Sequence, residues 1–387
     1  MNKSKQIKAM SLFANVGIAE AYFKDIGINV VAANEIDPKR VAFYRHVYPD
    51  VNVIEGDITT EEIKSTLVSI SDKEKIDLIL ATPPCQGMST AGKMDKWDAR
   101  NTLICHAIDV VKRIKPKYVF LENVPQQLTT KINYNGSIIA IPEYVRAELE
   151  EEYIFNDKMV IEAADYGVPQ FRERAIMLLV RRDIGKQWVF PEKTGTVTMR
   201  EALGDLPSID PEIYDISYEE MLGIFPKFEE KKKAGLEVSP WHYPPKHICR
   251  QVVSMMHTPS GATAFDNIDI FKPRKKDGQL VTGFRNTYKR QDWDRPGTTV
   301  TMYSREISSQ GNVHPGRYIG KDADGYDIYS DPRVMTIYEL MIMSSLPKDW
   351  NIPQWASDHF IRCVIGEGIP PLLVKKIMEQ LKEIENG

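Results

Sequence analysis

The sequence predicts an α/β protein with two parts, a larger domain of alternating strands and helices and a smaller, irregular one. In residues 1–183 short apolar runs alternate with helical patterns, which is typical of a parallel sheet covered by helices. Residues 184–330 are rich in Pro, Gly, aromatic and basic residues and have only short periodic stretches. Helical periodicity returns at 336–346 and 370–385. We therefore expect the segment 331–387 to complete the larger domain.

Each element of the larger domain is predicted from its own periodicity. Apolar runs that suit buried strands occupy 8–14, 28–35, 51–57, 77–83, 118–124 and 175–183. Amphipathic helical patterns occupy 16–27, 38–48, 61–71, 101–115 and 142–152. This order of elements predicts a Rossmann-like sheet, and open sheets of this kind bind ligands at the carboxyl ends of their strands.

The composition is that of an ordinary globular protein. The chain has 387 residues, of which 42% are hydrophobic and 27% charged, which excludes disordered and collagen-like classes. No apolar run approaches the roughly 20 residues of a membrane helix, and there is no signal-peptide pattern. We expect a cytoplasmic monomer without membrane contact. The four cysteines lie far apart without zinc-ligand spacing, so we expect neither a metal site nor a disulfide framework.

The charge is segregated along the chain. The whole chain has a formal net charge of −4, whereas residues 221–300 contain fourteen Lys and Arg against eight Asp and Glu. That stretch is therefore +6 and the remainder −10. Its basic residues alternate with aromatic residues and glycines, which suits contacts to phosphates and grooves, although a plain solvated surface is the alternative. A nucleic-acid partner is favoured.

Three successive strand ends suit a cofactor that contains a nucleoside. Gly17 follows the first predicted strand, where a glycine lets backbone approach a nucleotide. Alone it is better explained as an ordinary tight turn. Glu35 ends the second strand, at the spacing of an acid that binds ribose hydroxyls, and Asp57 ends the third. Together these three positions are better explained by a binding site for a nucleoside than by coincidence.

The next strand ends hold candidate catalytic residues. The loop ATPPCQGMS (81–89) places Cys85 behind two prolines at the ligand-binding edge, which favours a nucleophile over the usual buried filler. Glu122 follows the fifth strand; it is either a solvated cap or an acid whose pKa burial raises. Arg172 and Arg174 share one face of the next strand. They are either the solvated charges of an edge strand or donors of hydrogen bonds to a carbonyl oxygen or phosphate.

The order of these segments resembles the DNA cytosine-C5 methyltransferase family. The motifs are SLFANVG, NEID, GDIT, PPCQGMS, DARNTL, LENV, QFRER, RPGTTVT and GEGIPP, within residues 10–183 and 284–385. The resemblance implies an S-adenosylmethionine-dependent catalytic domain, a target-recognition domain inserted near 184–295, and a last helix packed against the first strand. The departures from the family pattern are Asn15 and Ile18 in place of glycines, Met88 in place of Phe and Glu367 in place of Asn.

The resemblance also implies partners and residue roles. It implies S-adenosylmethionine as cofactor and duplex DNA as substrate, in a prokaryotic cell that can also encode a cognate restriction endonuclease. Cys85 would add to C6 of a flipped-out cytosine, Glu122 would hold N3 and the exocyclic amine, and Arg174, supported by Arg172, would bind O2. The cofactor pocket would contain Phe13, Gly17, Glu35, Ile36, Asp57, Ile58, Pro84 and Leu103. The expected DNA contacts are Gln86, Ser89, Lys93, Arg100, Arg250, Arg285, Lys289 and Arg290.

Four other functions would require part of the same sequence pattern. A tRNA cytosine-C5 methyltransferase would use the same catalytic domain, but the separate basic insert suits sequence-specific reading of a duplex. An amino-methyltransferase needs no thiol, and a Rossmann oxidoreductase needs a fuller glycine fingerprint than Gly17 supplies. A non-catalytic DNA-binding module would not need Cys85, Glu122 and Arg174 together.

Overall fold

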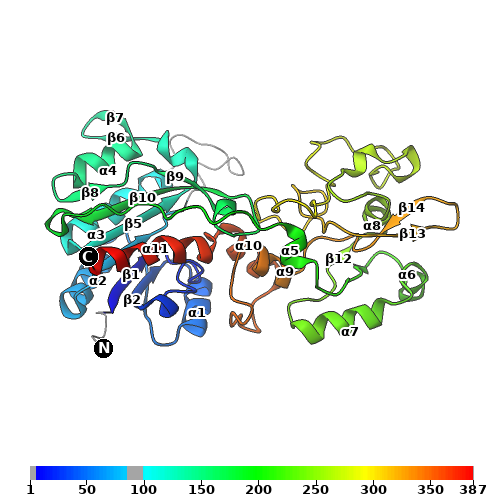
Figure 1. Cartoon of the computed structure of the whole chain (residues 1–387), viewed down its shortest axis with the longest axis horizontal. Helices are drawn as coiled ribbons and strands as arrows, with labels where there is room; N and C mark the ends of the chain where they lie inside the picture. The colour runs from blue at the N-terminus through cyan, green and yellow to red at the C-terminus, as the bar shows by residue number, and fades with distance from the viewer. Residues whose placement is uncertain (1–5, 85–98, 387) are drawn as a thin grey trace.

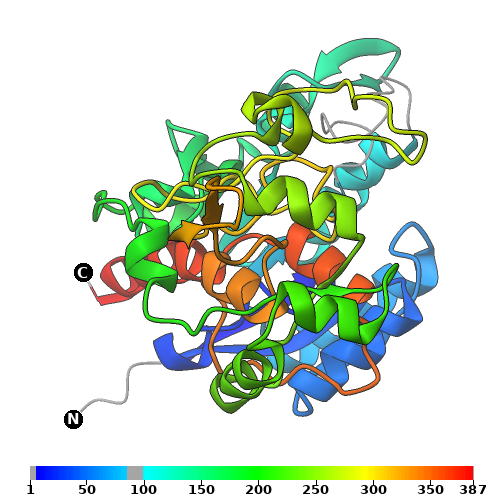
Figure 2. The same cartoon turned by 90° about the vertical axis from the view of Figure 1, so that its right-hand side faces the viewer.

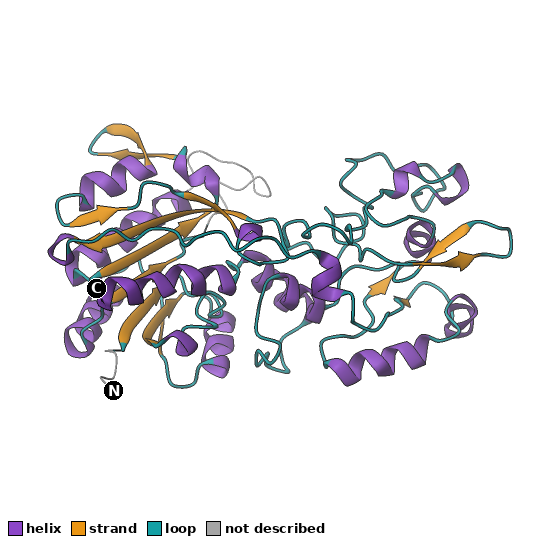
Figure 3. Cartoon of the chain, viewed as in Figure 1, coloured by secondary structure: helices purple, strands orange, loops and turns teal. Residues whose placement is uncertain are grey.

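The protein consists of a large lobe and a small lobe that lie next to each other along its longest axis (Figure 1). The structure, a computed structural model, describes residues 6–84 and 99–386. Figure 3 shows that the long strands gather in the large lobe, whereas the small lobe consists mainly of loops and short helices. Figure 2 looks onto the small lobe and shows its helices in front of the large lobe. No helix in the described ranges is both long and apolar enough to cross a membrane.

A mostly parallel sheet forms the centre of the large lobe. Its strands are β1 (Ile7–Leu12), β2 (Ile28–Glu35), β3 (Asn52–Glu55), β4 (Leu78–Ala81), β5 (Tyr118–Asn123), β8 (Tyr153–Phe155), β9 (Val160–Glu162) and β10 (Glu173–Arg181). The order is β3-β2-β1-β4-β5-β10-β8, and β9 pairs with the other end of β10. The first five strands of this order are parallel, and β10 runs antiparallel to β5. The carboxyl ends of β1, β2, β4 and β5 therefore meet at one edge.

Helices cover both faces of this sheet. They are α1 (Pro38–Val47), α2 (Glu61–Glu74), α3 (Leu103–Ile114), α4 (Ile141–Leu149) and α11 (Pro371–Asn386). Successive side chains of a strand point to opposite faces. Ile79 packs with α3 and α4, and its neighbour Leu80 packs with α11. Burial on both faces explains why these strands are continuous apolar runs in the sequence.

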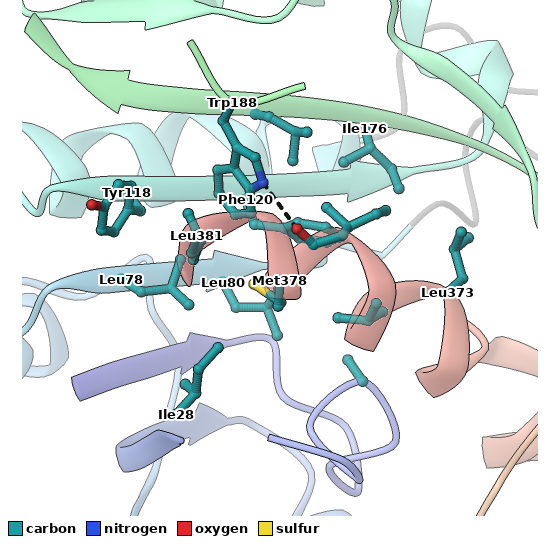
Figure 4. Packing of buried hydrophobic residues seen from close by; sticks show 14 of the residues in the cluster. Ile28, Leu78, Leu80, Tyr118, Phe120, Ile176, Trp188, Leu373, Met378 and Leu381 are labelled. Carbon is teal, nitrogen blue, oxygen red and sulfur yellow. Dashed lines mark hydrogen bonds between the residues drawn. The ribbon is translucent and has the colours of Figure 1, made fainter. Parts of the chain in front are cut away.

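Trp188 joins the sheet to α11 (Figure 4). The indole is fully buried beside Tyr118 and Phe120 of β5, and its Nε1 donates to the carbonyl oxygen of Ile377 at 3.0 Å. The last long helix thus packs onto the face of the sheet that includes β1, as the family resemblance implied. Trp188, which follows residue 183 in the sequence, therefore belongs to this core.

The small lobe is more helical than its irregular sequence suggested. It contains α6 (Tyr218–Ile224), α7 (Phe228–Val238), α8 (Cys249–Met256) and the short strands β11 (Glu212–Ile213), β12 (Lys246–His247), β13 (Tyr318–Lys321) and β14 (Asp327–Tyr329). Two small apolar clusters form its interior. A third cluster, at the junction of the lobes, contains α5 (Met199–Leu203), α9 (Ile337–Met343) and α10 (Asp358–Glu367). A hairpin of β6 (Lys131–Tyr134) and β7 (Ser137–Ala140) completes the described strands.

The predicted strands are confirmed, but one predicted helix is wrong. Residues 16–27 form turns that end in a short 3-10 helix, Lys24–Ile26. Hydrogen bonds in this segment join residues three apart, as from the N–H of Phe23 to the carbonyl oxygen of Glu20. The preceding loop is left-handed at Phe13, Asn15 and Gly17, which an α-helix does not allow. The apolar spacing of this segment reflects burial of its turns.

Candidate active site

A cavity of about 830 Å³ opens at the carboxyl edge of the sheet. Residues at the ends of β1, β2, β4 and β5 line it, together with the first residues of β10. Two segments from later in the chain complete the wall, 299–302 and 366–369. The motifs that lie far apart in the sequence therefore meet at one place.

Glu122 and Arg174 form a buried ion pair in this cavity. Glu122 lies near the end of β5 and Arg174 near the start of the antiparallel β10, which brings the two side chains together. Arg174 Nε lies 2.7 Å from Glu122 Oε1, and the two side chains are 9% and 10% exposed. Burial raises the pKa of Glu122, while the charges of Arg174 and Arg172 oppose this rise. The carboxyl can therefore hold a proton more readily than an exposed glutamate.

Arg172 holds the cavity wall in place through hydrogen bonds. Its guanidinium donates from Nη1 to the carbonyl oxygen of Val300 and from Nη2 to that of Gly366, each at 2.8 Å. These carbonyls belong to the two late segments that complete the cavity. Arg172 thus positions the wall, and it acts on Glu122 through its charge.

Seven of the eight expected cofactor residues line the cavity. They are Phe13, Glu35, Ile36, Asp57, Ile58, Pro84 and Leu103. The eighth expected residue, Gly17, is not among the described residues that line the cavity. A Cβ on Gly17 would clash with the ring of Tyr48, whose hydroxyl donates to the carbonyl oxygen of Gly17. The glycine, with φ +78°, allows this close packing beneath the loop.

The wall around Glu35 suits a nucleoside. Glu35 Oε1 accepts from the N–H groups of Ile36 and Asp37, and Oε2 accepts from that of Asn15. The carboxylate is thus held in one orientation, with lone pairs left for hydroxyl donors. Ile36 beside it is 60% exposed and offers an apolar surface. A ribose on the carboxylate and a base on the apolar side chain would satisfy both.

Several predicted site residues lie outside the described part of the chain. These are Cys85, Gln86, Ser89 and Lys93, as well as Met88 of the same motif. Arg100 belongs to a short 3-10 helix, Ala99–Thr102, of which only the backbone is described at that position. Pro84, the residue before Cys85, lines the cavity.

The expected DNA contacts of the small lobe differ in exposure. Arg250 and Arg285 are exposed, and Lys289 is half-buried. Arg250 donates to the carbonyl oxygen of Arg274, and Arg285 pairs with the Asp266 carboxylate.

Arg290 does not fit the prediction of a DNA contact. It is 1% exposed, and its guanidinium donates to the carbonyl oxygens of His314, Asp331 and Met255. It stabilises the interior of the small lobe, so we leave it out of the DNA surface.

A family model described as C-5 cytosine-specific DNA methylase matches residues 7–383. The chain belongs to this family. The methyltransferase is 37% identical to the type II methyltransferase M1.HgaI of Avibacterium volantium, over 97% of this chain and 98% of the relative. It is 28% identical to M.XorII of Xanthomonas oryzae pv. oryzae, over 96% and 84%.

Solved structures show the same fold at low sequence identity. The Entamoeba histolytica methyltransferase EhMeth is 13% identical with a TM-score of 0.60, over 98% of both chains. A Spodoptera frugiperda DNMT2 variant is 15% identical with a TM-score of 0.57, over 98% of this chain and 100% of the other.

Two polar features of the methyltransferase's cavity were missed by sequence reasoning. Asn123 Nδ2 donates to the carbonyl oxygen of Pro83 at 2.9 Å, which ties the base of the Cys85 loop to β5. Its place directly after Glu122 was the available signal. The second feature is a contact among Asn15, Arg40 and Glu367. Two of these were noted only as departures from the family pattern, and nothing in the sequence pairs them with Arg40.

Proposed function

We propose that the protein transfers a methyl group from S-adenosylmethionine to C5 of a cytosine flipped out of a specific duplex DNA sequence. The observation that supports this most is the shared cavity, in which the Glu122–Arg174 pair lies on the same edge as Glu35 and Asp57. A carboxyl suited to binding a base and carboxylates suited to binding a nucleoside thus line the same cavity. The names of the type II relatives favour a modification enzyme that accompanies a restriction endonuclease.

In the proposed mechanism Cys85 makes C5 reactive. C5 of cytosine is a poor nucleophile, so a thiolate first adds to C6 and the ring electron pair moves toward N3. Glu122, whose pKa is raised by burial, donates its proton to N3 and accepts a hydrogen bond from the exocyclic amine. Arg174 keeps Glu122 in place and offers guanidinium donors for O2. Bound S-adenosylmethionine supplies an electrophilic methyl group. A base then removes the C5 proton, the bond between C6 and Cys85 Sγ breaks to release the thiolate, and the proton on N3 returns to the carboxylate of Glu122.

The proposed DNA surface combines the segment after Cys85 with the basic stretch of the small lobe. Extruding a base from the stack costs a few kcal/mol, which phosphate contacts must offset. Arg250, Arg285 and Lys289 are the described residues of this surface. Replacing a phosphate-binding residue such as Lys289 by Ala should weaken binding to all sequences and reduce the salt slope by about one. An unchanged slope in all three alanine variants would remove this surface from the interface.

The decisive experiment traps the covalent intermediate. Duplex DNA with 5-fluorocytosine at the target should form a denaturant-resistant adduct with the wild type only when S-adenosylmethionine is present, because fluorine cannot leave as a proton. The cross-linked peptide should contain Cys85. Cys85→Ser should form no adduct and methylate nothing, whereas the matched variant Cys105→Ser should do both. An adduct on another cysteine would refute the mechanism, and transfer to tRNA instead of DNA would refute the substrate.

A further inference from the structure

Three side chains meet on the cavity wall where the loop after β1 faces the end of α10. Arg40 Nη2 lies 2.8 Å from Glu367 Oε2, and Asn15 Nδ2 donates to the same oxygen at 3.2 Å. All three residues line the cavity. Glu367 belongs to α10, Arg40 to α1 and Asn15 to the loop, so the contact is assembled from three separate elements.

Two oxygens of this cluster lack a hydrogen-bond partner within the described residues. Glu367 Oε1 and Asn15 Oδ1 are both buried and both unpaired there. A buried acceptor without a donor is costly, most of all on a carboxylate. Both orphaned atoms are acceptors, so a group that satisfied them would have to donate hydrogen bonds. A group with several N–H donors and a positive charge would satisfy them best.

The position of Asn15 connects this cluster to the nucleoside wall. Its backbone N–H donates to Glu35 Oε2 at 2.8 Å, while its side chain donates to Glu367. The backbone is left-handed at φ +49°, a conformation that costs energy for an asparagine and that the surrounding structure maintains. Asn15 therefore donates a hydrogen bond to both carboxylates. These are Glu35, which suits a ribose, and Glu367, which has an oxygen without a partner among the described residues. A small ligand could reach both sites at once.

We propose that Glu367, held by Arg40 and Asn15, receives the α-ammonium group of the amino-acid end of the cofactor. The inference rests on the proposed function, since it assigns one end of the proposed ligand. An amino-acid end is a zwitterion, and the Arg40–Glu367 pair presents the complementary charges to the cavity. Asn15 Oδ1 supplies a second acceptor for the same ammonium. Glu367 is thus a specificity residue for ligands with a free amino group.

The charge environment of Glu367 agrees with a cationic ligand. Burial raises the pKa of this carboxyl, Arg40 opposes the rise, and Glu35 adds to it. One arginine therefore does not fully compensate the buried carboxylate. A second positive charge at Oε1 would favour the ionised form.

Binding calorimetry with two ligands tests this inference without reference to turnover. The ligands are S-adenosylhomocysteine and its deamino analogue, S-adenosyl-4-thiobutyrate, which differ only in the ammonium group. The wild type should bind the deamino analogue about 10- to 100-fold more weakly, the range of a lost charge-assisted hydrogen bond. Glu367→Gln should lose a similar factor for S-adenosylhomocysteine and little for the analogue. Asn15→Gly, which accepts the positive φ, should lose severalfold for S-adenosylhomocysteine only.

The control variant is Glu55→Gln. It also removes a carboxylate that faces an arginine, since Glu55 Oε2 lies 3.8 Å from Arg45 Nη1, but Glu55 does not line the cavity. It should leave both affinities unchanged. A Glu367→Gln protein that keeps the full preference for the amino group would overturn the inference. So would an equal loss for both ligands, because that indicates a structural role. If the wild type binds neither ligand, the proposed cofactor itself is wrong, and that outcome is distinct from the other two.

Discussion

Two buried arginine–carboxylate groups in the described part of the chain differ in their surroundings. Glu122 and Arg174 face the cavity of the large lobe. At the junction of the lobes, Arg333 lies 2.8 Å from Glu339 and 2.9 Å from Asp331, and all three side chains are at most 1% exposed. The chemical groups are alike, so the comparison isolates the effect of the environment.

The pKa values of the two buried glutamates, Glu122 and Glu339, shift in opposite directions. Arg333 also donates to the carbonyl oxygens of Ile209 and Val334, and Glu339 also accepts from the N–H of Thr336. Although burial acts to raise it, the pKa of Glu339 falls to about 2, because Arg333 and His314 outweigh the burial. Burial raises the pKa of Glu122 instead. A buried carboxylate with many hydrogen-bond donors and cations around it stays ionised, whereas one with few of them binds a proton more readily.

Glu20 extends the comparison to a buried carboxyl that forms no ion pair within the described residues. It is 3% exposed, lies near Ser11, Tyr44 and Tyr48, and burial raises its pKa to about 7. The interaction with Ser11 acts to lower this pKa but does not outweigh the burial. Three buried glutamates thus span the range from a structural anion to a group that titrates near neutral pH.

The largest effect is expected at Glu122. Glu122→Gln keeps the shape but cannot exchange a proton, so the single-turnover rate of methyl transfer to duplex DNA should fall by about 10²- to 10⁴-fold. The melting temperature should change little, since the amide can still accept a hydrogen bond from Arg174. The exposed Glu151→Gln is the control and should keep the wild-type rate. A full rate in Glu122→Gln would place the proton transfer elsewhere.

A loss of stability is expected at Arg333. Arg333→Met leaves two buried carboxylates without their cation, so the free energy of unfolding at pH 7 should fall by about 3–5 kcal/mol. The lowered pKa of Glu339 means that the network stabilises the fold above about pH 4.5 and that this contribution disappears as the pH falls toward 2. Urea unfolding at pH 7 and pH 3 should therefore show a larger difference at pH 7. The surface change Lys348→Met should stay within about 0.5 kcal/mol, and an equally small effect at Arg333 would contradict the comparison.

A smaller, stabilising effect is expected at Glu20. Its folded pKa of about 7 lies above the ordinary value of 4.5, so the protonated form favours folding and this contribution is lost as the pH rises through 7. Glu20→Gln mimics the protonated form and should raise the free energy of unfolding by about 1–3 kcal/mol at pH 8, and by little at pH 5. Denaturant unfolding at the two pH values measures this. A gain independent of pH would indicate improved packing, with no titration of Glu20.

The sequence predicted those parts of the fold whose signal is local. β2 was expected at the residues where it lies, because an uninterrupted apolar strand needs no partner to be recognised. Glu122 was predicted for the same reason, as a polar residue at the end of such a strand, and Arg174 was predicted because it shares one face of the next strand with Arg172. Segment 16–27 has helical spacing, yet the left-handed residues before it and its bonds between residues three apart prevent a helix. Periodicity does not reveal such backbone constraints.

Contacts between distant segments could not be predicted. Arg290 resembles its basic neighbours in the sequence, and only the fold shows that three carbonyl oxygens surround its guanidinium. Glu367 and Arg40 belong to elements at opposite ends of the chain. Pairing them requires the arrangement of α10 against α1, which no local pattern contains.

The packing of α11 over the sheet has a consequence for the order of folding during synthesis. β1 leaves the ribosome early, whereas the helix that covers its face is made only after the entire small lobe. Until then the apolar side chains around Trp188 lack their cover, and the nascent large lobe is a target for chaperones. Closure depends on contacts of long sequence separation and should be slow. The small lobe, with its own apolar clusters, can fold first and would then hold the two halves of the large lobe close together.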